Sequence, residues 1–177
     1  MAALVLGEEA AIAELFDRFR GVVRKMLIRT LGSAHDVEDL TQETFLIVLR
    51  RVSTLRDPML LSSFVIGAAV RVAKNELRKR AVRRWIGLEE APPLVETVNP
   101  EAREGVTRLY RALERLDAST RVVFVLRHVE GRELTELADA LGTSLSTVKR
   151  RLARAEARFE AIARNDAVLR AYLEGEG

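Results

Sequence analysis

The stretch ELTELADALGTSLSTVKRRLARAEARF, from Glu133 to Phe159, encodes two helices with a tight turn between them. Leucine and alanine recur at helical spacing before Gly142, a residue free to take the left-handed conformation that such a turn requires. Ser144 follows as a good N-cap. The second helix then carries an apolar stripe of Val148, Leu152, Ala155, Phe159 and Ile162. This pattern predicts a helix-turn-helix.

The outward face of the second helix is polar and strongly basic. It carries Ser146, Thr147, Lys149, Arg150, Arg151, Arg154 and Arg158. Such a helix fits the DNA major groove with its first turns at the base edges, while the later basic residues meet phosphates. An ordinary helical hairpin with a solvated basic face would carry the same charges. The turn, the cap and the charges together favour DNA binding.

The rest of the 177-residue chain also follows helical spacing, and strand signals are scarce. We therefore expect an all-α fold of two small helical domains joined by a flexible linker, the second domain containing the helix-turn-helix. The expected ranges are 8–84 for the first domain, 85–105 for the linker, which is rich in proline and acids, and 106–164 for the second domain.

Three helices are expected in the first domain and four in the second. The first helix ends at Gly32, and Ser33 with Asp36 resembles a capping box for a second helix over about 34–52. A third helix starts near Ser63, after a loop broken by Pro58. The helices of the second domain are expected near 106–117, 119–130, 133–141 and 145–164.

The expected third helix ends in RVAKNELRKRAVRR, Arg71 to Arg84, with seven basic residues and one acid. The whole chain has a net charge of only +3, so the basicity is local. Helical spacing places Ile66, Ala69, Val70, Ala73 and Leu77 on one side and a cationic stripe on the other. The stripe indicates either a track for phosphates or a solvated helix face.

Several function classes are disfavoured. The chain has no cysteine, which excludes disulfides and thiol chemistry and fits a cytoplasmic protein. We expect no secretory signal, because the N-terminal stretch lacks a basic leader, and the longest apolar run is too short to span a membrane. His35 and His128 are far apart in sequence and are expected to be structural. Without a phosphate loop, a nucleophile motif or a cluster of metal ligands, we expect no enzyme, no cofactor and no metal.

Two separated stretches resemble one family. LTELADALGTSLSTVKRRLARA (134–155), preceded by ALERLDASTRVVFVLRHVEG (112–131), is similar to the promoter-reading helix-turn-helix of extracytoplasmic-function (ECF) sigma factors of the bacterial sigma-70 family. DVEDLTQETFLIVLRRV (36–52) resembles the helix by which that family binds core RNA polymerase, whose usual core is DLxQETF. The two matches occur in the family's order. A helix-turn-helix alone is shared with many regulators, so the pair is far more specific.

The resemblance implies an alternative-type sigma factor that binds core RNA polymerase and directs promoter recognition and transcription initiation. It implies core-polymerase binding by Asp39, Leu40, Gln42, Glu43, Phe45 and Leu46. It assigns binding of the minus-ten DNA to Arg56, Ser62, Phe64, Arg71, Lys74, Asn75, Arg78 and Lys79, and binding of the adjoining DNA also to Arg80, Arg83 and Arg84. It assigns binding of the minus-thirty-five element to Ser146, Thr147, Lys149, Arg150, Arg151 and Arg154. The implied partners are core polymerase, promoter DNA and an anti-sigma factor.

The sequence also departs from the family pattern and leaves alternatives open. Gly67 and Val70 stand where basic residues are common, so base capture is expected to be weaker or differently specified. Glu133 stands where a serine cap is frequent, so the start of that helix is expected to be looser. A stand-alone helix-turn-helix regulator with a helical partner-binding domain would explain 106–163 but leaves DLTQETF without a role. A third alternative is a helical interaction module without DNA contact, for which neutralising Lys149, Arg150, Arg151 and Arg154 would change nothing in transcription.

Overall fold

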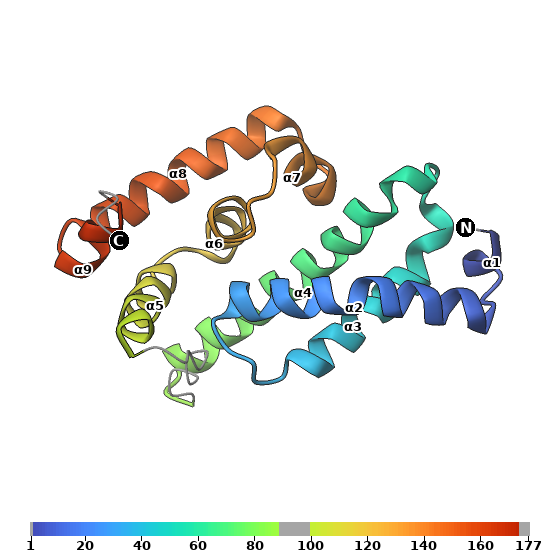
Figure 1. Cartoon of the computed structure of the whole chain (residues 1–177), viewed down its shortest axis with the longest axis horizontal. Coiled ribbons are helices and arrows are strands. Elements are labelled where there is room, and N and C mark those ends of the chain that lie inside the picture. The colour runs from blue at the N-terminus through green and yellow to red at the C-terminus, as the bar shows by residue number, and fades with distance from the viewer. Residues whose placement is uncertain (1, 89–99, 174–177) are drawn as a thin grey trace.

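The computed structural model describes residues 2–88 and 100–173, with side chains placed over 2–88 and 104–170. All regular structure in these ranges is helical (Figure 1). The first domain contains α1 (Ala2–Val5), α2 (Glu9–Leu31), α3 (Val37–Arg51), η1 (Val52–Thr54), η2 (Pro58–Leu60) and α4 (Leu61–Trp85). The second contains α5 (Pro100–Leu113), α6 (Ala118–Phe124), η3 (Val125–Val129), α7 (Leu134–Leu141), α8 (Leu145–Ala163) and α9 (Ala167–Leu173). The predicted all-α, two-domain architecture is confirmed.

Two expected boundaries differ from the structure. The chain leaves α2 through Gly32 in the left-handed region, and Asp36 is also left-handed, so α3 begins only at Val37. Ser33 is buried and its Oγ accepts from the His35 N–H at 3.0 Å, which makes it part of the turn rather than a helix cap. The Ser33 capping box is therefore wrong. Helix α5 begins at Pro100, inside the expected linker, and residues 89–99 of that linker lie outside the described residues.

The first domain packs α2, α3 and α4 around a shared apolar core. Its centre consists of Val23, Leu27, Val48, Val65 and Ala69, none of which is exposed. The predicted stripe of α4 is confirmed, because Ile66, Ala69, Val70, Ala73 and Leu77 are all buried. Burying side chains of this kind contributes roughly 1.5–3 kcal/mol each for the larger residues, so this core accounts for the position of α4.

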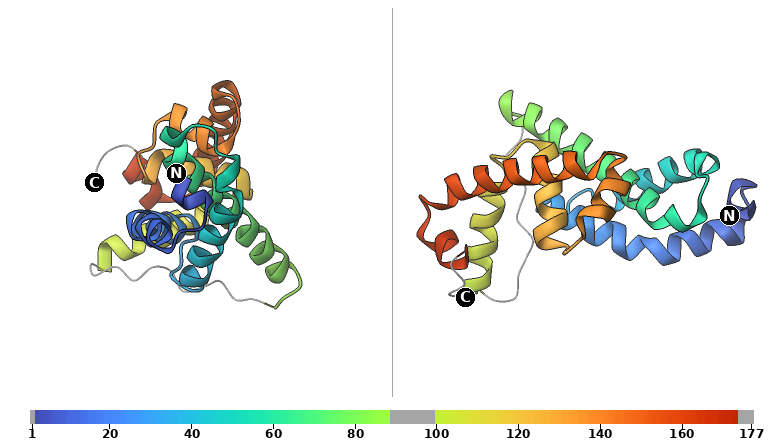
Figure 2. Two further views of the ribbon diagram at one scale, coloured as in Figure 1. Left: turned by 90° about the vertical axis from the view of Figure 1, so that its right-hand side faces the viewer. Right: turned by 90° about the horizontal axis from the view of Figure 1, so that it is seen from above.

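The second domain lies against the first instead of standing apart from it. Helix α6 contacts α8 on one side and α4 on the other, and Figures 1 and 2 show it between them. The apolar core of the first domain continues without interruption into Val122, Leu126, Leu137 and Val148 of the second. A separate cluster around Leu113, Val125 and Phe159 holds α5, α6, α8 and α9 together.

Helix α6 is fixed by a charged N-cap. The Asp117 carboxylate accepts from the backbone N–H groups of Ser119 and Thr120 at 3.0 and 3.1 Å and from the Thr120 hydroxyl at 2.8 Å. Partial burial raises the pKa of Asp117, but the hydrogen bonds from Thr120 and Ser119 and the nearby Arg158 outweigh it and leave that pKa below its ordinary value of 3.8.

Asp117→Ala is expected to lower the free energy of unfolding by roughly 0.5–2 kcal/mol, because two backbone donors lose their acceptor. Since the pKa is lowered in the folded state, the contribution of the charge is complete above pH 3.8 and is lost as the pH falls through the lower folded value. Urea unfolding at neutral pH compares the variant with Asp117→Asn, which keeps a capping oxygen. Equal losses in both variants would show that the stabilisation comes from the charge of Asp117 and not from its capping oxygen.

Candidate nucleic-acid interface

The helix-turn-helix predicted from the sequence is formed by α7, a short turn and α8. Gly142 has a φ of 56°, and the N–H of Thr143 donates to the Ala138 carbonyl at 3.0 Å, which closes the end of α7. The Ser144 side chain caps α8 by accepting from the Thr147 N–H at 3.3 Å. The start of α7 is not loose as expected, because the Glu136 carboxylate accepts from the Glu133 N–H at 2.9 Å.

The predicted basic face of α8 is open to solvent. Ser146, Lys149, Arg150 and Arg154 are exposed, while Thr147 and Arg151 are half-buried. The hydroxyl groups of Ser146 and Thr147 lie 3.0 and 2.9 Å from the Ser144 hydroxyl, so the first turn is held rigid by local hydrogen bonds. The opposite face of α8, from Val148 to Phe159, is buried. A rigid helix presenting cations on one side has the shape and charge to enter a major groove.

The outward face of α3 combines acids with one exposed leucine. Asp39 and Gln42 are exposed, Glu43 is half-buried, and the Leu46 side chain is 52% exposed. Such a face offers polar groups around an apolar contact, as a partner helix requires. Leu40 and Phe45 were also expected to contact the polymerase, but both are buried in the core. They support the exposed residues from beneath, so little of either side chain is available to a partner.

Only part of the cationic stripe of α4 is exposed to solvent. Arg71, Asn75, Arg78 and Lys79 are exposed, and Lys74 is half-buried. Arg80 is not part of this surface, because it is 4% exposed and donates to the Glu76 carboxylate at 2.8 Å. Arg83 and Arg84 pair with Glu76 and Glu114, at 3.0 and 3.4 Å. The prediction that Arg80 lies beside DNA is therefore wrong: it faces inward along α4, where a buried charge needs a partner.

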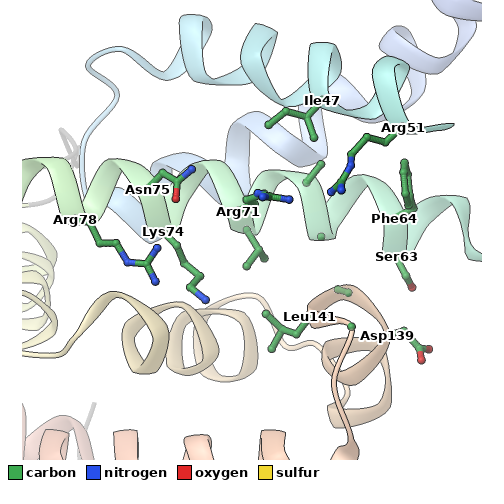
Figure 3. Close-up of a pocket in the computed structure, with 15 residues that line it drawn as sticks. Ile47, Arg51, Ser63, Phe64, Arg71, Lys74, Asn75, Arg78, Asp139 and Leu141 are labelled. Atoms are coloured by element: carbon green, nitrogen blue, oxygen red, sulfur yellow. The ribbon is translucent and has the colours of Figure 1, made fainter. Parts of the chain in front are cut away.

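Most of the predicted minus-ten residues line one cleft. The cleft has a volume of about 600 Å³ and lies between α3, α4 and α7. Figure 3 shows Phe64, Arg71, Lys74, Asn75 and Arg78 along its α4 wall, with Leu141 and Asp139 of α7 on the other side of the helix from Ile47. Arg56, Ser62 and Lys79 lie outside this cleft. Arg51, at the end of α3, does line it and was missed, although the paired arginines that end α3 are a visible signal.

Electrostatics distinguish this cleft from ordinary surface. Burial lowers the pKa of Lys74, and the neighbouring cations Arg78 and Arg151 lower it further. Asp139 is the one carboxylate among the cleft's lining residues. Cations concentrated in a partly desolvated hollow attract anions more strongly than the same charges spread over a surface. The cleft can therefore hold phosphate groups.

The two histidines each lie beside a carboxylate. His35 contacts the Asp36 carboxylate at 3.2 Å and His128 contacts that of Glu156 at 2.9 Å, each on a different part of the surface. No group of three or more His, Asp or Glu side chains in the described ranges could hold a metal ion. Across residues 2–88 and 100–173, no helix combines the length and hydropathy that a membrane span needs.

Comparison with known proteins identifies both domains. The family model "Sigma-70 region 2" matches residues 15–83, and "Sigma-70, region 4" matches residues 107–159. The ferric citrate uptake sigma factor FecI of Escherichia coli K12 is 33% identical over 148 residues, which cover 80% of this chain and 84% of that protein. The ECF RNA polymerase sigma factor SigM of Mycobacterium tuberculosis is 28% identical over 159 residues, which cover 90% of this chain and 80% of that protein.

The arrangement of helices is also shared with solved structures. CnrH in complex with the cytosolic domain of CnrY has a TM-score of 0.63, 24% identity, and coverage of 94% of this chain and 96% of that one. RpoE of Bartonella quintana, in complex with the anti-sigma factor NepR, has a TM-score of 0.63, 18% identity, and coverage of 87% and 97%. The chain belongs to the ECF sigma factors of the sigma-70 family, which bind core RNA polymerase and direct it to promoters.

Proposed function

We propose that the first domain, over about residues 8–84, joins the protein to core RNA polymerase and to the melted minus-ten element. Asp39, Gln42, Glu43 and Leu46 contact the polymerase, because they form one accessible face of α3 above the buried Leu40 and Phe45. Arg71, Lys74, Asn75 and Arg78 carry the DNA strand, with Phe64 as a stacking surface and Arg51 as a further phosphate contact. Arg56, Ser62 and Lys79 contact the strand beyond the cleft.

The second domain, over about residues 106–164, reads the minus-thirty-five element as duplex DNA. Ser146, Lys149 and Arg150 meet base edges, while Thr147, Arg151 and Arg154 support the helix and contact phosphates. The observation that carries the proposal is that one chain holds an acidic partner-binding face on α3, a cationic cleft on α4 and a basic recognition helix α8. A stand-alone regulator would need only the last of these.

The protein performs no catalysis of its own, and binding energy alone drives promoter melting. It acts in the cytoplasm, where its polymerase partner is found. An anti-sigma factor restrains it, as NepR is bound to RpoE in the related structure.

Transcription in vitro tests the function directly. Bacterial core polymerase is mixed with a genomic fragment library, with and without this protein, and new transcript starts are sequenced. We expect protein-dependent starts that share two upstream elements. The absence of new starts, together with tight binding of duplex DNA by the protein alone, would instead indicate a conventional regulator.

The α3 assignment predicts that Asp39→Ala with Glu43→Ala weakens binding to core polymerase by about tenfold or more while the helical content stays unchanged. The two carboxylates are accessible, so their removal leaves the core intact. Titration of labelled protein with core polymerase measures the effect, and Glu14→Ala on the exposed surface of α2 is a matched control. Unchanged affinity in the double variant would contradict the assignment.

A further inference from the structure

A second cationic hollow lies in the second domain, where α5 packs against the end of α8 and the start of α9. Its volume is about 300 Å³. Arg108, Arg111 and Arg115 line it from α5, and their spacing of three and four residues places them on one face of that helix. Asn165 and Asp166 line it from the junction of α8 and α9. Figures 1 and 2 show α5 and α9 at the end of the second domain that is farther from α7.

The three arginines differ in how their charges are compensated. Arg108 donates to both oxygens of the Asp166 carboxylate at 3.0 Å and to the Glu104 carboxylate at 2.7 Å, so it ties α5 to the α8–α9 junction. Arg111 and Arg115 are exposed, and neither forms a side-chain hydrogen bond or an ion pair within residues 2–88 and 104–170. Like charges four residues apart destabilise a helix. These two guanidinium groups therefore leave their donors available to an anion.

The hollow also has an apolar lining, which an ordinary patch of surface arginines lacks. Ala112 and Leu169 are buried, and Ile162 is half-buried. Asn165 adds an exposed side-chain amide, which can both donate and accept a hydrogen bond. Sites for small molecules combine apolar surface with a few polar groups and occupy roughly 300–1,000 Å³. The hollow is at the small end of this range, so it fits a compact ligand with one anionic and one apolar part.

The chemistry of the lining indicates what that ligand is. Guanidinium groups recognise phosphate oxygens through paired N–H donors, and two such groups together suit a phosphate ester. A flat, largely apolar ring with polar edges suits the apolar lining and the amide of Asn165. Both parts occur together in a nucleotide. The backbone of duplex DNA offers the same phosphates, but its bases are paired and stacked, so they cannot enter the apolar part.

We propose that this hollow is a binding site for a mononucleotide. Arg111 and Arg115 hold its phosphate groups, the base lies against Ile162 and Leu169, and Asn165 pairs with a polar edge of the base. The bound nucleotide bridges α5 and the α8–α9 junction, where Arg108 already joins them. The site is separate from the promoter-binding surfaces proposed above and does not rest on them.

Fluorescence anisotropy of mant-ADP, titrated with the full chain at low salt, tests the site. We expect saturable binding that unlabelled ADP displaces, with adenosine and inorganic phosphate each at least about tenfold less effective, because each fills only part of the hollow. Arg111→Gln with Arg115→Gln should weaken binding by at least about tenfold. The matched control is Lys25→Gln with Arg50→Gln, which removes two positive charges from exposed positions of the first domain and should bind as the wild type does.

Asn165→Trp provides a second variant, because it keeps both arginines and fills the hollow from an exposed position. It should weaken mant-ADP binding as strongly as the double arginine variant, and circular dichroism verifies that each variant is folded. Absence of saturable binding, equal losses in the charge control, or inorganic phosphate as effective as ADP would overturn the proposal. Loss of binding in Lys149→Ala with Arg150→Ala would place the nucleotide on the recognition helix instead and would also overturn it. Transcription is measured separately, so failure of the proposed function is recognised independently of nucleotide binding.

Discussion

Glu76→Ala is expected to lower the free energy of unfolding by roughly 3–5 kcal/mol, the largest effect on stability that we predict. Glu76 is buried in the middle of α4 and accepts from Arg80 at 2.8 Å and from Arg83 at 3.0 Å. Without the carboxylate, the Arg80 charge stays buried without a counterion. Its Nη1 atom already has no hydrogen-bond partner in the structure, so no spare acceptor compensates.

Urea unfolding followed by circular dichroism measures this loss. Glu38→Ala is the control, because Glu38 also pairs with two arginines, Arg20 and Arg24, but on an exposed surface where ion pairs contribute little. The double variant Glu76→Ala with Arg80→Met removes both buried charges and should be more stable than the single variant. A small effect of Glu76→Ala, or a double variant less stable than the single one, would contradict the buried ion pair.

Lys149→Ala combined with Arg150→Ala is expected to reduce transcription from the protein's own promoters by at least about tenfold. Each good contact to a base edge contributes roughly 1–3 kcal/mol of discrimination, and both side chains are exposed in the first turns of α8. Neither side chain supports the core, which lies on the opposite face at Val148 and Leu152. The fold should therefore be unchanged.

The control for this prediction is Arg164→Ala, which removes one positive charge just after the other end of α8. Runoff transcription and its dependence on salt distinguish the two roles. Loss of a phosphate contact lowers the salt slope by about one and weakens all promoters equally, whereas loss of a base contact relaxes the sequence preference. Equal activity of the double variant and the wild type would contradict the assignment of α8 as the helix that reads the minus-thirty-five element.

Local sequence determined the helices and the turn of the second domain. Gly142, Ser144 and the apolar stripe from Val148 to Phe159 act through contacts within a few residues, so their structure follows from helical period and capping alone. The exposed residues of α3 and α8 could be predicted for the same reason. Each of these helices buries one face, so the helical period determines which residues lie on the exposed face.

Only the tertiary structure decided the surroundings of α4. This helix packs against α2 and α3 and also against α6 and α7, so the assumption of a single solvent face fails. Arg78 and Arg80 are two residues apart in one basic run, yet one is exposed and the other is buried with Glu76. Likewise, nothing near Gly67 in sequence indicates the Ala140 carbonyl, which lies 73 residues further along the chain. Contacts between distant segments depend on how whole helices pack, which local patterns do not encode.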